Sequence, residues 1–392
     1  MRISMFSILP ALLCILLQRE SFSQCNTDVF GIAQFYPSAA STREWTSAHW
    51  NNGVDRTVKY ASDSYDPTDW TEDHSGSTNG FHIDGNGVMS MSGGSPRFHI
   101  NSLRTTKVSA QFYLNIEFTA YYRRVGTTGA DYGGMIVGAR SGPLGHASSG
   151  GNDCDATTYY SRFRNDGKWD FEKELKHPTS DYWSGSGFHT QDPLWKGNKV
   201  LPENRWIGMK YIIYNIENNT KVKLEVYIDS VSNGNPVNGG HWEKVGEVTD
   251  AGSWPAAPSA ISGCSYTDQM MIILQGHGTL LLRTDGDQAD YKMVSIREID
   301  TSVPSSYPCI TTATQQPSTA PPVFCYPNPA KDELSVSVPG DFSYEVYDVT
   351  GVQVEKGSGT NNCRVGRQLP AGVYLILIRS EAIIERVKFI KE

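Results

Sequence analysis

The sequence lacks the features that mark several common classes of protein. Beyond its first residues, no stretch is apolar for long enough to cross a membrane as a helix. There is no CxxC pair and no cluster of Cys and His, which argues against a zinc site. There is no basic excess either. Lys and Arg number 34 against 42 Asp and Glu, and the net charge of -8 argues against a protein that binds nucleic acid.

Long helical periodicities are also absent, and this absence shapes the expected fold. The 392 residues include 37 Gly and 20 Tyr, and many segments alternate between polar and apolar residues. Such alternation, broken by Gly-rich turns, predicts antiparallel strands. We therefore expect an all-β protein. A large antiparallel jelly-roll sandwich would span residues 24–300, a linker rich in Pro, Ser and Thr 301–322, and a small C-terminal β-sandwich 323–392.

The first residues predict a secretory signal peptide. Arg2 supplies a positive start, residues 8–17 supply a short apolar run, and Ser21 and Ser23 are small residues placed for cleavage after Ser23. The expected signal peptide is therefore 1–23.

Six of the seven cysteines remain after that cleavage: Cys25, Cys154, Cys264, Cys309, Cys325 and Cys363. An even number in an exported chain predicts disulfides, and six cysteines allow fifteen pairings. Two pairs are favoured. Cys325 with Cys363 would staple the C-terminal domain, and Cys25 with Cys309 would tie the ends of the large domain together.

The clearest strand is residues 111–124, QFYLNIEFTAYYRR. Strict alternation predicts that Phe112, Ile116 and every second residue face a core, while the residues between them face outward. The outward set carries amide, carboxylate, phenol and guanidinium groups, which can bind sugars or act as acids and bases. It includes Tyr113, Asn115, Glu117, Tyr121 and Arg123. A solvated strand face is an equally good interpretation of the pattern.

Residues 157–177 predict a β-hairpin with a two-residue turn at Asp166 and Gly167. One face would then mix aromatic rings with cations and the other would carry acidic groups. The opposed pairs would be Arg164 with Trp169, Arg162 with Phe171, and Tyr160 with Lys173; the acidic set is Asp170, Glu172 and Glu174. Neither face is purely apolar, so the sequence does not decide which one meets the core.

Further candidate binding residues lie outside these two segments. Arg140 ends a short strand, and Tyr227 faces outward from the alternating strand 221–229. Residues 178–205 predict a long loop, a feature that is usually functional in a compact domain. Trp183 and Trp195 lie in this loop, where they could stack on sugar rings. Packing at the edge of the sandwich is the alternative role for them.

The C-terminal segment carries three motifs in order: "YPNPAKDELSVSV", "YEVYDVTGVQVEKG" and "LPAGVYLILIRSEAIIERVKFIKE". They resemble the type A C-terminal sorting domain of the type IX secretion system of Bacteroidetes. The resemblance implies that residues 323–392 engage that secretion machinery, and that the protein is exported to the cell surface or the extracellular space. A generic adhesive sandwich is the alternative.

The large domain loosely resembles the concanavalin A-like jelly rolls, through its polar-faced strands and its closing strand "DYKMVSIREID". That group includes carbohydrate-binding modules, glycoside hydrolases and polysaccharide lyases. The resemblance implies a polysaccharide partner, but it does not choose among these activities because one fold hosts many functions.

Two kinds of catalysis are compatible with the residues. Elimination next to a uronate needs a cation or amide at the carboxylate, a base at C5 and a donor for the leaving oxygen. Tyr121, Arg123 and His177 are the first candidates, and Arg97 with His99 resembles the Arg- and His-bearing strands of jelly-roll lyases. Hydrolysis needs two close carboxylates, for which Glu117 and the Asp170–Glu174 segment are candidates. The complete motif of neither class is present.

We therefore expect polysaccharide binding first, with a lyase and a structural adhesin as alternatives and a lyase favoured over a hydrolase if the protein is catalytic. Sugar binding would use Tyr113, Asn115, Arg140, Tyr160, Arg162, Arg164, Lys173, Trp183, Trp195 and Tyr227. No cofactor is expected. A structural calcium ion is possible at Asp285, Asp287 and Asp290, although a solvated acidic turn explains these residues better.

Overall fold

The computed structural model divides into two compact units, Met1–Thr311 and Thr312–Glu392. It describes residues 25–42, 44–58, 63–66, 72–75, 80–100, 113–127, 130–142, 153–197, 199–255, 261–275, 279–307, 324–326, 328–380 and 384–392. The predicted signal peptide at 1–23, Cys309 and residues 308–322 of the predicted linker lie outside these ranges.

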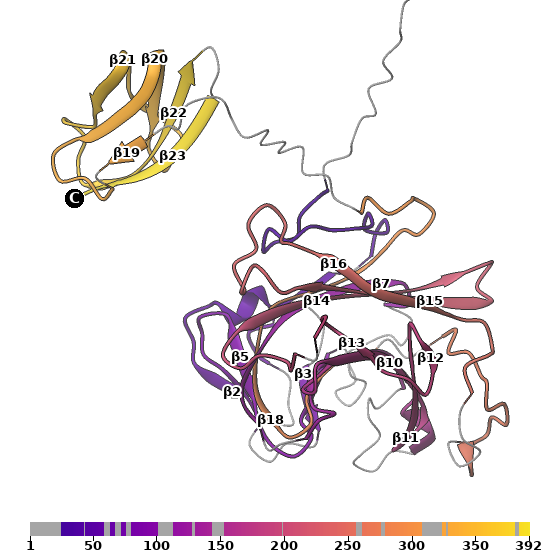
Figure 1. Ribbon diagram of the computed structural model, residues 1–392. Coiled ribbons are helices and arrows are strands. Elements are labelled where there is room, and N and C mark those ends of the chain that lie inside the picture. The colour runs from indigo at the N-terminus through magenta and orange to yellow at the C-terminus, as the bar shows by residue number, and fades with distance from the viewer. Residues whose placement is uncertain are drawn as a thin grey trace, which may run out of the picture. The chain divides into compact units, whose positions relative to one another are not determined.

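The large unit is built from two antiparallel sheets, which face each other in Figure 1. The first sheet has the order β16 (Glu243–Asp250), β15 (Lys221–Asp229), β14 (Trp206–Ile216), β7 (Ile116–Thr127), β18 (Asp287–Glu298), β5 (Val88–Met91), β4 (Phe81–Ile83) and β2 (Arg56–Val58), with β1 (Glu44–Thr46) also paired to β18. The short 3-10 helix η1 (Ser47–Trp50) follows β1.

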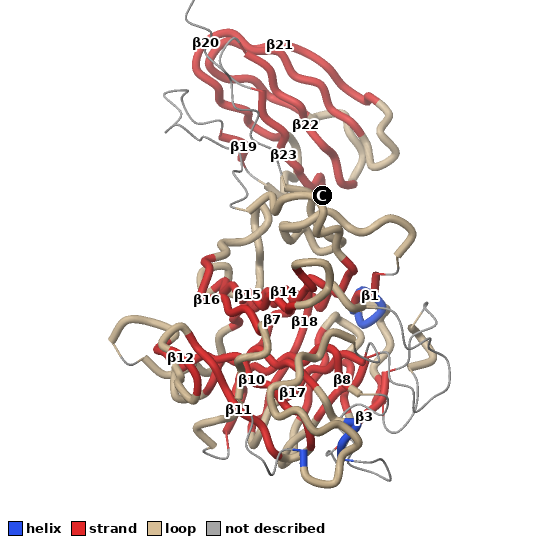
Figure 2. Tube along the Cα trace, turned by 90° about the vertical axis from the view of Figure 1, so that its right-hand side faces the viewer, coloured by secondary structure: helices blue, strands red, loops and turns tan. Residues whose placement is uncertain are grey.

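The second sheet has the order β12 (Gly187–Phe188), β11 (Thr179–Ser184), β10 (Lys168–Lys176), β9 (Thr158–Arg164), β8 (Gly134–Ser141), β17 (Thr279–Arg283), β6 (Arg97–Ile100) and β3 (Glu72–Ser75), with β13 (Asp192–Pro193) paired to β10. The chain crosses between the sheets several times, as from β6 to β7 and from β17 to β18, which is the connection pattern of a jelly roll. Figure 2 shows how little of the chain is helical. The predicted all-β sandwich is confirmed.

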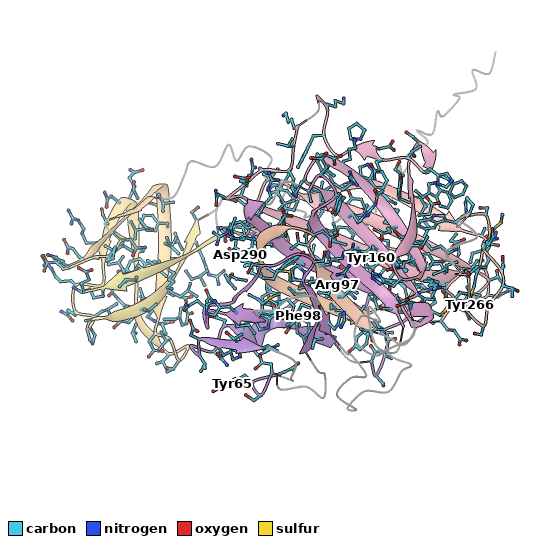
Figure 3. All side chains as sticks on the ribbon, turned by 90° about the horizontal axis from the view of Figure 1, so that it is seen from below. Tyr65, Arg97, Phe98, Tyr160, Tyr266 and Asp290 are labelled. Carbon is cyan, nitrogen blue, oxygen red and sulfur yellow. A yellow bond between two sulfur atoms is a disulfide. The ribbon has the colours of Figure 1, made fainter. Side chains whose placement is uncertain are left out.

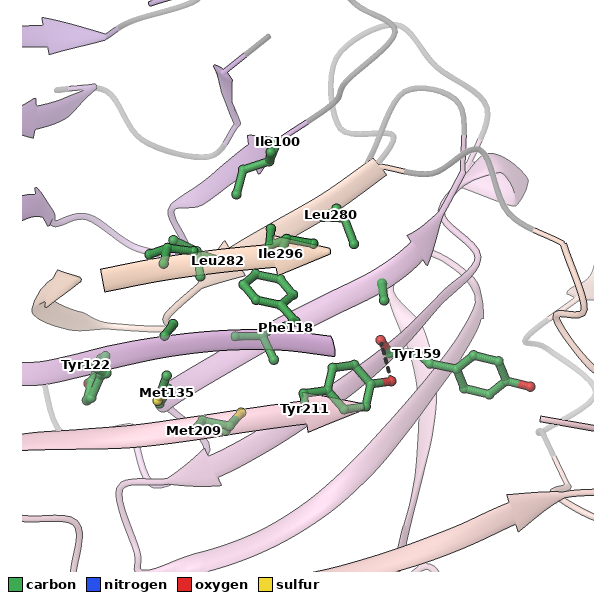
Figure 4. Close-up of a cluster of buried hydrophobic side chains, with 14 of the residues drawn as sticks. Ile100, Phe118, Tyr122, Met135, Tyr159, Met209, Tyr211, Leu280, Leu282 and Ile296 are labelled. Atoms are coloured by element: carbon green, nitrogen blue, oxygen red, sulfur yellow. Dashed lines mark hydrogen bonds between the residues drawn. The ribbon is translucent and has the colours of Figure 1, made fainter. Parts of the chain in front are cut away.

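Side chains from the inner faces of both sheets form one core. Phe118 of β7, Met209 of β14 and Ile296 of β18 meet Met135 of β8 and Leu282 of β17 (Figure 4). The Tyr211 hydroxyl donates to the main-chain oxygen of Tyr159 across this core at 3.4 Å. The alternation along β7 correctly predicted its inward set, because an extended chain turns successive side chains to opposite faces.

The predicted hairpin is present as β9 and β10, but its register differs by one residue from the prediction. Trp169 pairs with Phe163 and Glu172 with Tyr160. The turn takes three residues rather than two: the Gly167 N–H bonds to the Arg164 carbonyl, and Gly167 adopts a left-handed φ of 77°. A shift of one residue moves each side chain relative to its neighbours. Lys173 therefore faces the core, whereas the three outward residues Tyr160, Arg162 and Arg164 lie alongside Asp170, Glu172 and Glu174.

Residues 178–205 are not the structureless loop that was expected, because they contain β11, β12 and β13. A disulfide joins Cys154, in the 3-10 helix η3 (Asp153–Asp155), to Cys264. The sequence favoured other pairs. Cys25 is disulfide-bonded, and its predicted partner, Cys309, lies outside the described residues.

The small unit has its own apolar core, which includes Val336, Val346, Ile376 and Phe389. Its sheet has the order β19 (Phe324–Tyr326), β20 (Leu334–Tyr347), β22 (Gly372–Ser380) and β23 (Ile384–Lys391), and β21 (Gln353–Val365) pairs with β20. The Ala330 N–H bonds to the Ile390 carbonyl, which folds the end of β23 back beside the segment that follows β19.

The expected disulfide between Cys325 and Cys363 is wrong. Both residues lie opposite Val336, one on each side of β20. A whole strand therefore separates them, and two strand spacings exceed the reach of a disulfide. In the described part of the chain, none of the helices has the length and apolar character needed to cross a membrane.

Candidate functional site

The outward face of β7, expected to be open, is covered. Its central residue Glu117 is 2% exposed and accepts hydrogen bonds from the backbone N–H groups of Phe35 and Tyr36. Its carboxylate also pairs with Lys210 at 2.6 Å and Arg297 at 2.5 Å. Burial alone would raise the pKa of Glu117, but these two cations outweigh it and hold the pKa below its ordinary value. Glu117 therefore stabilises the fold. Contrary to the prediction, it cannot contact a polysaccharide.

Other members of the predicted face, and Tyr227 of β15, are also committed to internal contacts. The Tyr121 hydroxyl donates to Asp229 at 2.7 Å and the Tyr227 hydroxyl to Glu225 at 2.6 Å, with both rings buried. Tyr113 is fully buried, and the Asn115 side chain accepts from the Asn215 N–H at 2.8 Å. Burial raises the pKa of Tyr121 far above its ordinary value, and Asp229 adds to the rise. An unexposed phenol of this kind is no candidate base.

Arg123 and Arg140 have different surroundings. Arg123 is half-buried, pairs with Asp290 at 2.6 Å and lies over the Trp206 ring. Arg140 is fully buried and donates to the main-chain oxygens of Leu114 and Ile273 at 2.9 and 2.7 Å. Burial lowers the pKa of Arg140 to about 10. Arg140 therefore holds two segments together and does not reach a ligand.

Three further candidates belong to the interior or the edge of the sandwich. Lys173 pairs with Asp250 at 2.8 Å between the two sheets, with both side chains buried. Trp183 packs against Trp254 with ring centroids 5.4 Å apart. Trp195 is partly buried against the same core. The alternative role, packing, is the one observed for both tryptophans.

The remaining candidates meet on the outward face of the second sheet, which we call the arginine face. Its members come from the four strands β6, β17, β9 and β10 and from the residue just beyond β10: Arg97, His99, Tyr160, Arg162, Arg164, Glu172, Glu174, His177 and Arg283. Phe98 and Leu282 point into the core, so their neighbours Arg97 and Arg283 point outward and lie directly opposite each other. Figure 3 labels Arg97 and Tyr160 on this face.

Tyr160 is at the centre of the arginine face. Its hydroxyl donates to Glu174 Oε2 at 2.9 Å, and Glu174 Oε1 lies 2.9 Å from His177 Nδ1. Burial raises the pKa of Tyr160 well above its ordinary value, with Glu174 adding to the rise, so the phenol keeps its proton. A neutral His177 that donates from Nδ1 to Glu174 would have its lone pair on Nε2. The side chain of His177 is 27% exposed, which places this chain of groups at the rim of the face.

Gly138 of β8 allows the middle of the face to close. A Cβ atom on Gly138 would lie 2.9 Å from Leu281 Cγ and 3.0 Å from the Tyr160 ring. Because Gly138 has no Cβ atom, the Leu281 and Tyr160 side chains meet over β8. The Arg283 guanidinium then lies 5.2 Å from the centre of the Tyr160 ring.

The guanidinium groups of this face differ in their partners. Arg162 is bound by Asp170 at 2.6 Å and by Glu172, Arg164 pairs with Asp166, and Arg283 pairs with Asp285 at 2.8 Å. Arg97 is 7% exposed and has no carboxylate within salt-bridge distance in the described structure. Its Nη1 donates to the Ser95 carbonyl, and its Nε has no partner there. Burial and the facing Arg283 lower the pKa of Arg97.

Sequence reasoning did not place Arg283 in the site. Its segment, "TLLLR", is apolar on both sides of the strand, so alternation alone could not show that Leu281 and Arg283 face outward. Arg283 lies beside Arg97 and His99 only because β6 pairs with β17. These two strands are far apart in the sequence, so the sequence alone does not predict this pairing.

The three carboxylates considered for calcium point to separate partners. Asp285 pairs with Arg283, Asp290 pairs with Arg123, and Asp287 accepts from the Gly134 N–H at 2.7 Å. All three carboxylates are buried. The turn is therefore not solvated, contrary to the expectation. Within the ranges described above, His, Cys, Asp and Glu side chains form no group of three that could hold a metal ion.

Comparison with solved structures finds similar chains at low sequence identity. The exoplasmic domain of VIP36, in its form bound to Ca2+ and Man3GlcNAc, is 11% identical and covers 63% of this chain and 91% of its own, with a TM-score of 0.33. The alginate lyase vAL-1 from Chlorella virus is 8% identical over 67% and 88%, with a TM-score of 0.26. Lectin II from Ulex europaeus is 8% identical over 58% and 91%, with a TM-score of 0.27. We draw nothing about activity from similarities of this size.

Comparison by sequence identifies the small unit only. No curated protein matches the chain. A family model, the secretion system C-terminal sorting domain, matches residues 325–392, which is the unit formed by β19 to β23. Residues 325–392 are thus a type IX secretion system sorting domain, and the chain is exported to the cell surface or the extracellular space.

Proposed function

We propose that the large unit binds an acidic polysaccharide on the arginine face. The observation that carries the proposal is Arg97, a buried guanidinium that faces a second guanidinium and has no carboxylate of its own in the described structure. Like charges directly opposite each other in a sheet are unfavourable. A planar carboxylate of a uronate sugar would relieve this repulsion, because a guanidinium binds carboxylates through two parallel hydrogen bonds.

The edge of the same face offers a stacking surface. Tyr182 of β11 is half-buried, and the Arg162 guanidinium lies 5.9 Å from its ring centre. Aromatic rings stack on the apolar faces of sugars. A glycan that presents its carboxylate to Arg97 and Arg283 would extend over Tyr160 towards this edge, since Tyr160, Glu172 and Tyr182 lie opposite one another on adjacent strands.

Affinity electrophoresis of the purified protein in gels that contain alginate or polygalacturonate, with a neutral glucan gel as reference, tests this proposal. We expect retardation in the acidic gels. The Arg97→Met variant should bind at least about tenfold more weakly, since it loses a charge-assisted hydrogen-bonding group. The matched control is Arg367→Met, which removes an exposed arginine of the sorting domain. Equal retardation of the wild type and Arg97→Met would refute the role of Arg97.

A second candidate function, β-elimination, is favoured by the Tyr160–Glu174–His177 chain. Arg97 and Arg283 would stabilise the uronate as charge develops on it, His177 at the rim would take the C5 proton, and a water molecule would protonate the leaving oxygen. Tyr160, which is fully buried, would hold Glu174 in place behind His177 and would not donate to the sugar.

The assay for this second function follows ultraviolet absorbance of unsaturated uronate together with new reducing ends. A lyase raises both, and His177→Ala should then lose turnover while it keeps binding. Binding without either signal would leave a binding module. No binding to any glycan would favour the structural adhesin.

A further inference from the structure

A pocket of about 360 Å3 lies on the first sheet, on the opposite side of the sandwich from the arginine face. Its wall includes His82, Ser90, Val125, Gln288 and Asp290, from β4, β5, β7 and β18. A row of directly opposed residues passes through it, from His82 to Ser90, Asp290 and Arg123. The pocket is thus built from the sheet itself, at the low end of the range of volumes of small-molecule sites.

The two ionisable side chains in the described wall of the pocket each have a polar partner. Asp290 is paired with Arg123, whose Nε and Nη2 donate to Oδ2 at 3.0 and 2.6 Å. His82 Nε2 lies 3.0 Å from Asp55. In contrast to Arg97 on the other sheet, neither group needs a ligand of opposite charge, and so the pocket has no preference for a charged sugar.

The pocket retains hydrogen-bonding capacity. A carboxylate has about four acceptor positions, and Asp290 uses three of them, for Ser90 Oγ and the two Arg123 contacts. The exposed Gln288 amide makes no hydrogen bond to another described side chain or backbone group, and it offers two donors and an acceptor. Val125, which is 42% exposed, adds an apolar wall. Donors, acceptors and one apolar patch in an uncharged site match a sugar ring with its hydroxyl groups and C–H face.

We propose that this pocket binds a neutral sugar unit, with Gln288 and Asp290 hydrogen-bonding its hydroxyl groups and Val125 contacting its ring. The protein would then carry two glycan sites of different charge preference on opposite sheets. This second site does not depend on the arginine face. A variant at either site therefore leaves the other one intact.

Titration calorimetry of the purified full-length protein with mannose, galactose, glucose and their neutral oligosaccharides tests the proposal, with galacturonate as the charged comparison. We expect at least one neutral sugar to bind and galacturonate to bind this pocket no better. Gln288→Ala should weaken neutral-sugar binding about tenfold. Val125→Trp should abolish it by filling the pocket.

Val231→Trp is the matched control, because it places the same side chain at an exposed valine outside the pocket. Arg97→Met should leave neutral-sugar binding unchanged. The proposal is overturned if no neutral sugar binds, if Val125→Trp binds as well as the wild type, or if Val231→Trp causes the same loss as Val125→Trp.

Discussion

The buried carboxylate of Glu117 binds two cations that are themselves buried. Lys210 and Arg297 both bind its carboxylate, and the Phe35 and Tyr36 N–H groups complete its set of donors. Removing one partner of a buried ion pair leaves an uncompensated charge. We expect Glu117→Ala to lower the free energy of unfolding by about 3–5 kcal/mol in urea titrations.

The control for this prediction is Glu217→Ala, because Glu217 pairs with Lys221 at 2.7 Å and the two side chains are 59% and 34% exposed. An exposed pair of this kind contributes less than about 1 kcal/mol. Similar losses of unfolding free energy in the two variants would show that the buried Glu117 cluster contributes no more than an exposed ion pair.

Glu117 also gives the stability a pH dependence of known sign. Its pKa in the folded protein is lowered, so the unfolded state takes up its proton first as the pH falls. Its contribution is present above the ordinary pKa of a glutamate, about 4.3, and is lost as the pH falls through the lower folded value. Thermal melts between neutral and acid pH should show a shallower decline for Glu117→Gln than for the wild type. A parallel decline would contradict the assignment.

At this scale the sequence predicted which side chains share a face, but not what covers it. Alternation along β7 placed Glu117 and Tyr121 together correctly. The cover over Glu117 comes from residues 32–36, which lie about eighty positions earlier and show no pattern that points to β7. Contacts between residues this far apart in sequence depend on the complete fold. For that reason the polar face of β7, which the sequence predicted as a possible site, is a buried part of the structure.

Among the elements, the β9–β10 hairpin shows how one turn residue sets a face. Gly167 combines a left-handed φ of 77° with a close approach to the Lys199 carbonyl, which a Cβ atom would overlap. Gly167→Ala should therefore destabilise the protein by more than the roughly 1 kcal/mol of backbone strain alone. Urea unfolding measures this loss.

Gly197→Ala is the matched comparison. Gly197 has a similar φ of 86°, but a Cβ atom there meets nothing within 4 Å. The difference between the two variants isolates the clash with Lys199, and equal losses would rule the clash out.

The hairpin also marks the limit of turn-based prediction. Residues 165–167 contain a signal for a tight turn, and the hairpin formed as expected. Two-residue and three-residue turns share that signal, yet they differ by one residue in register. That single residue decided that Tyr160, Arg162 and Arg164 would share a face with Glu172 and Glu174. The sequence could not predict the pairing of Cys154 with Cys264 either. The two segments meet at the end of β10, where the His177 N–H bonds to the Asp153 carbonyl and Lys176 bonds to the Ser262 carbonyl.

For the whole molecule, the division into two units separates the proposed glycan binding from export. Each unit has its own apolar core. Deleting residues 325–392 should leave the large unit folded and able to bind its glycan, while the protein no longer reaches the cell surface. Fractionation of cells that express the full and shortened chains, with glycan binding assayed on both, measures the two effects. Surface delivery of the shortened chain would contradict the role of the sorting domain.

The sequence predicted more of the whole molecule than of its sites. Composition and alternation were enough for the all-β class, and the three C-terminal motifs identified the sorting domain. The candidate site was spread over segments from Arg97 to Arg283, and only the sheet order brings these together. The pairing of β6 with β17 leaves no local trace in the sequence.

The last described residues of the large unit lie beside the segment that covers Glu117, and this arrangement has a mechanical consequence. The Ser306 N–H bonds to the Phe35 carbonyl, and the Tyr307 ring packs 4.5 Å from the Phe35 ring and 4.8 Å from that of Tyr227. Tension applied to the chain beyond Tyr307 would pull on these contacts. It is shared among these contacts and the hydrogen bonds of Phe35 and Tyr36 to Glu117 before it reaches β18. A surface protein that holds a glycan while being pulled from its C-terminal side would thus bear the load on a buried ion cluster instead of unzipping a sheet edge.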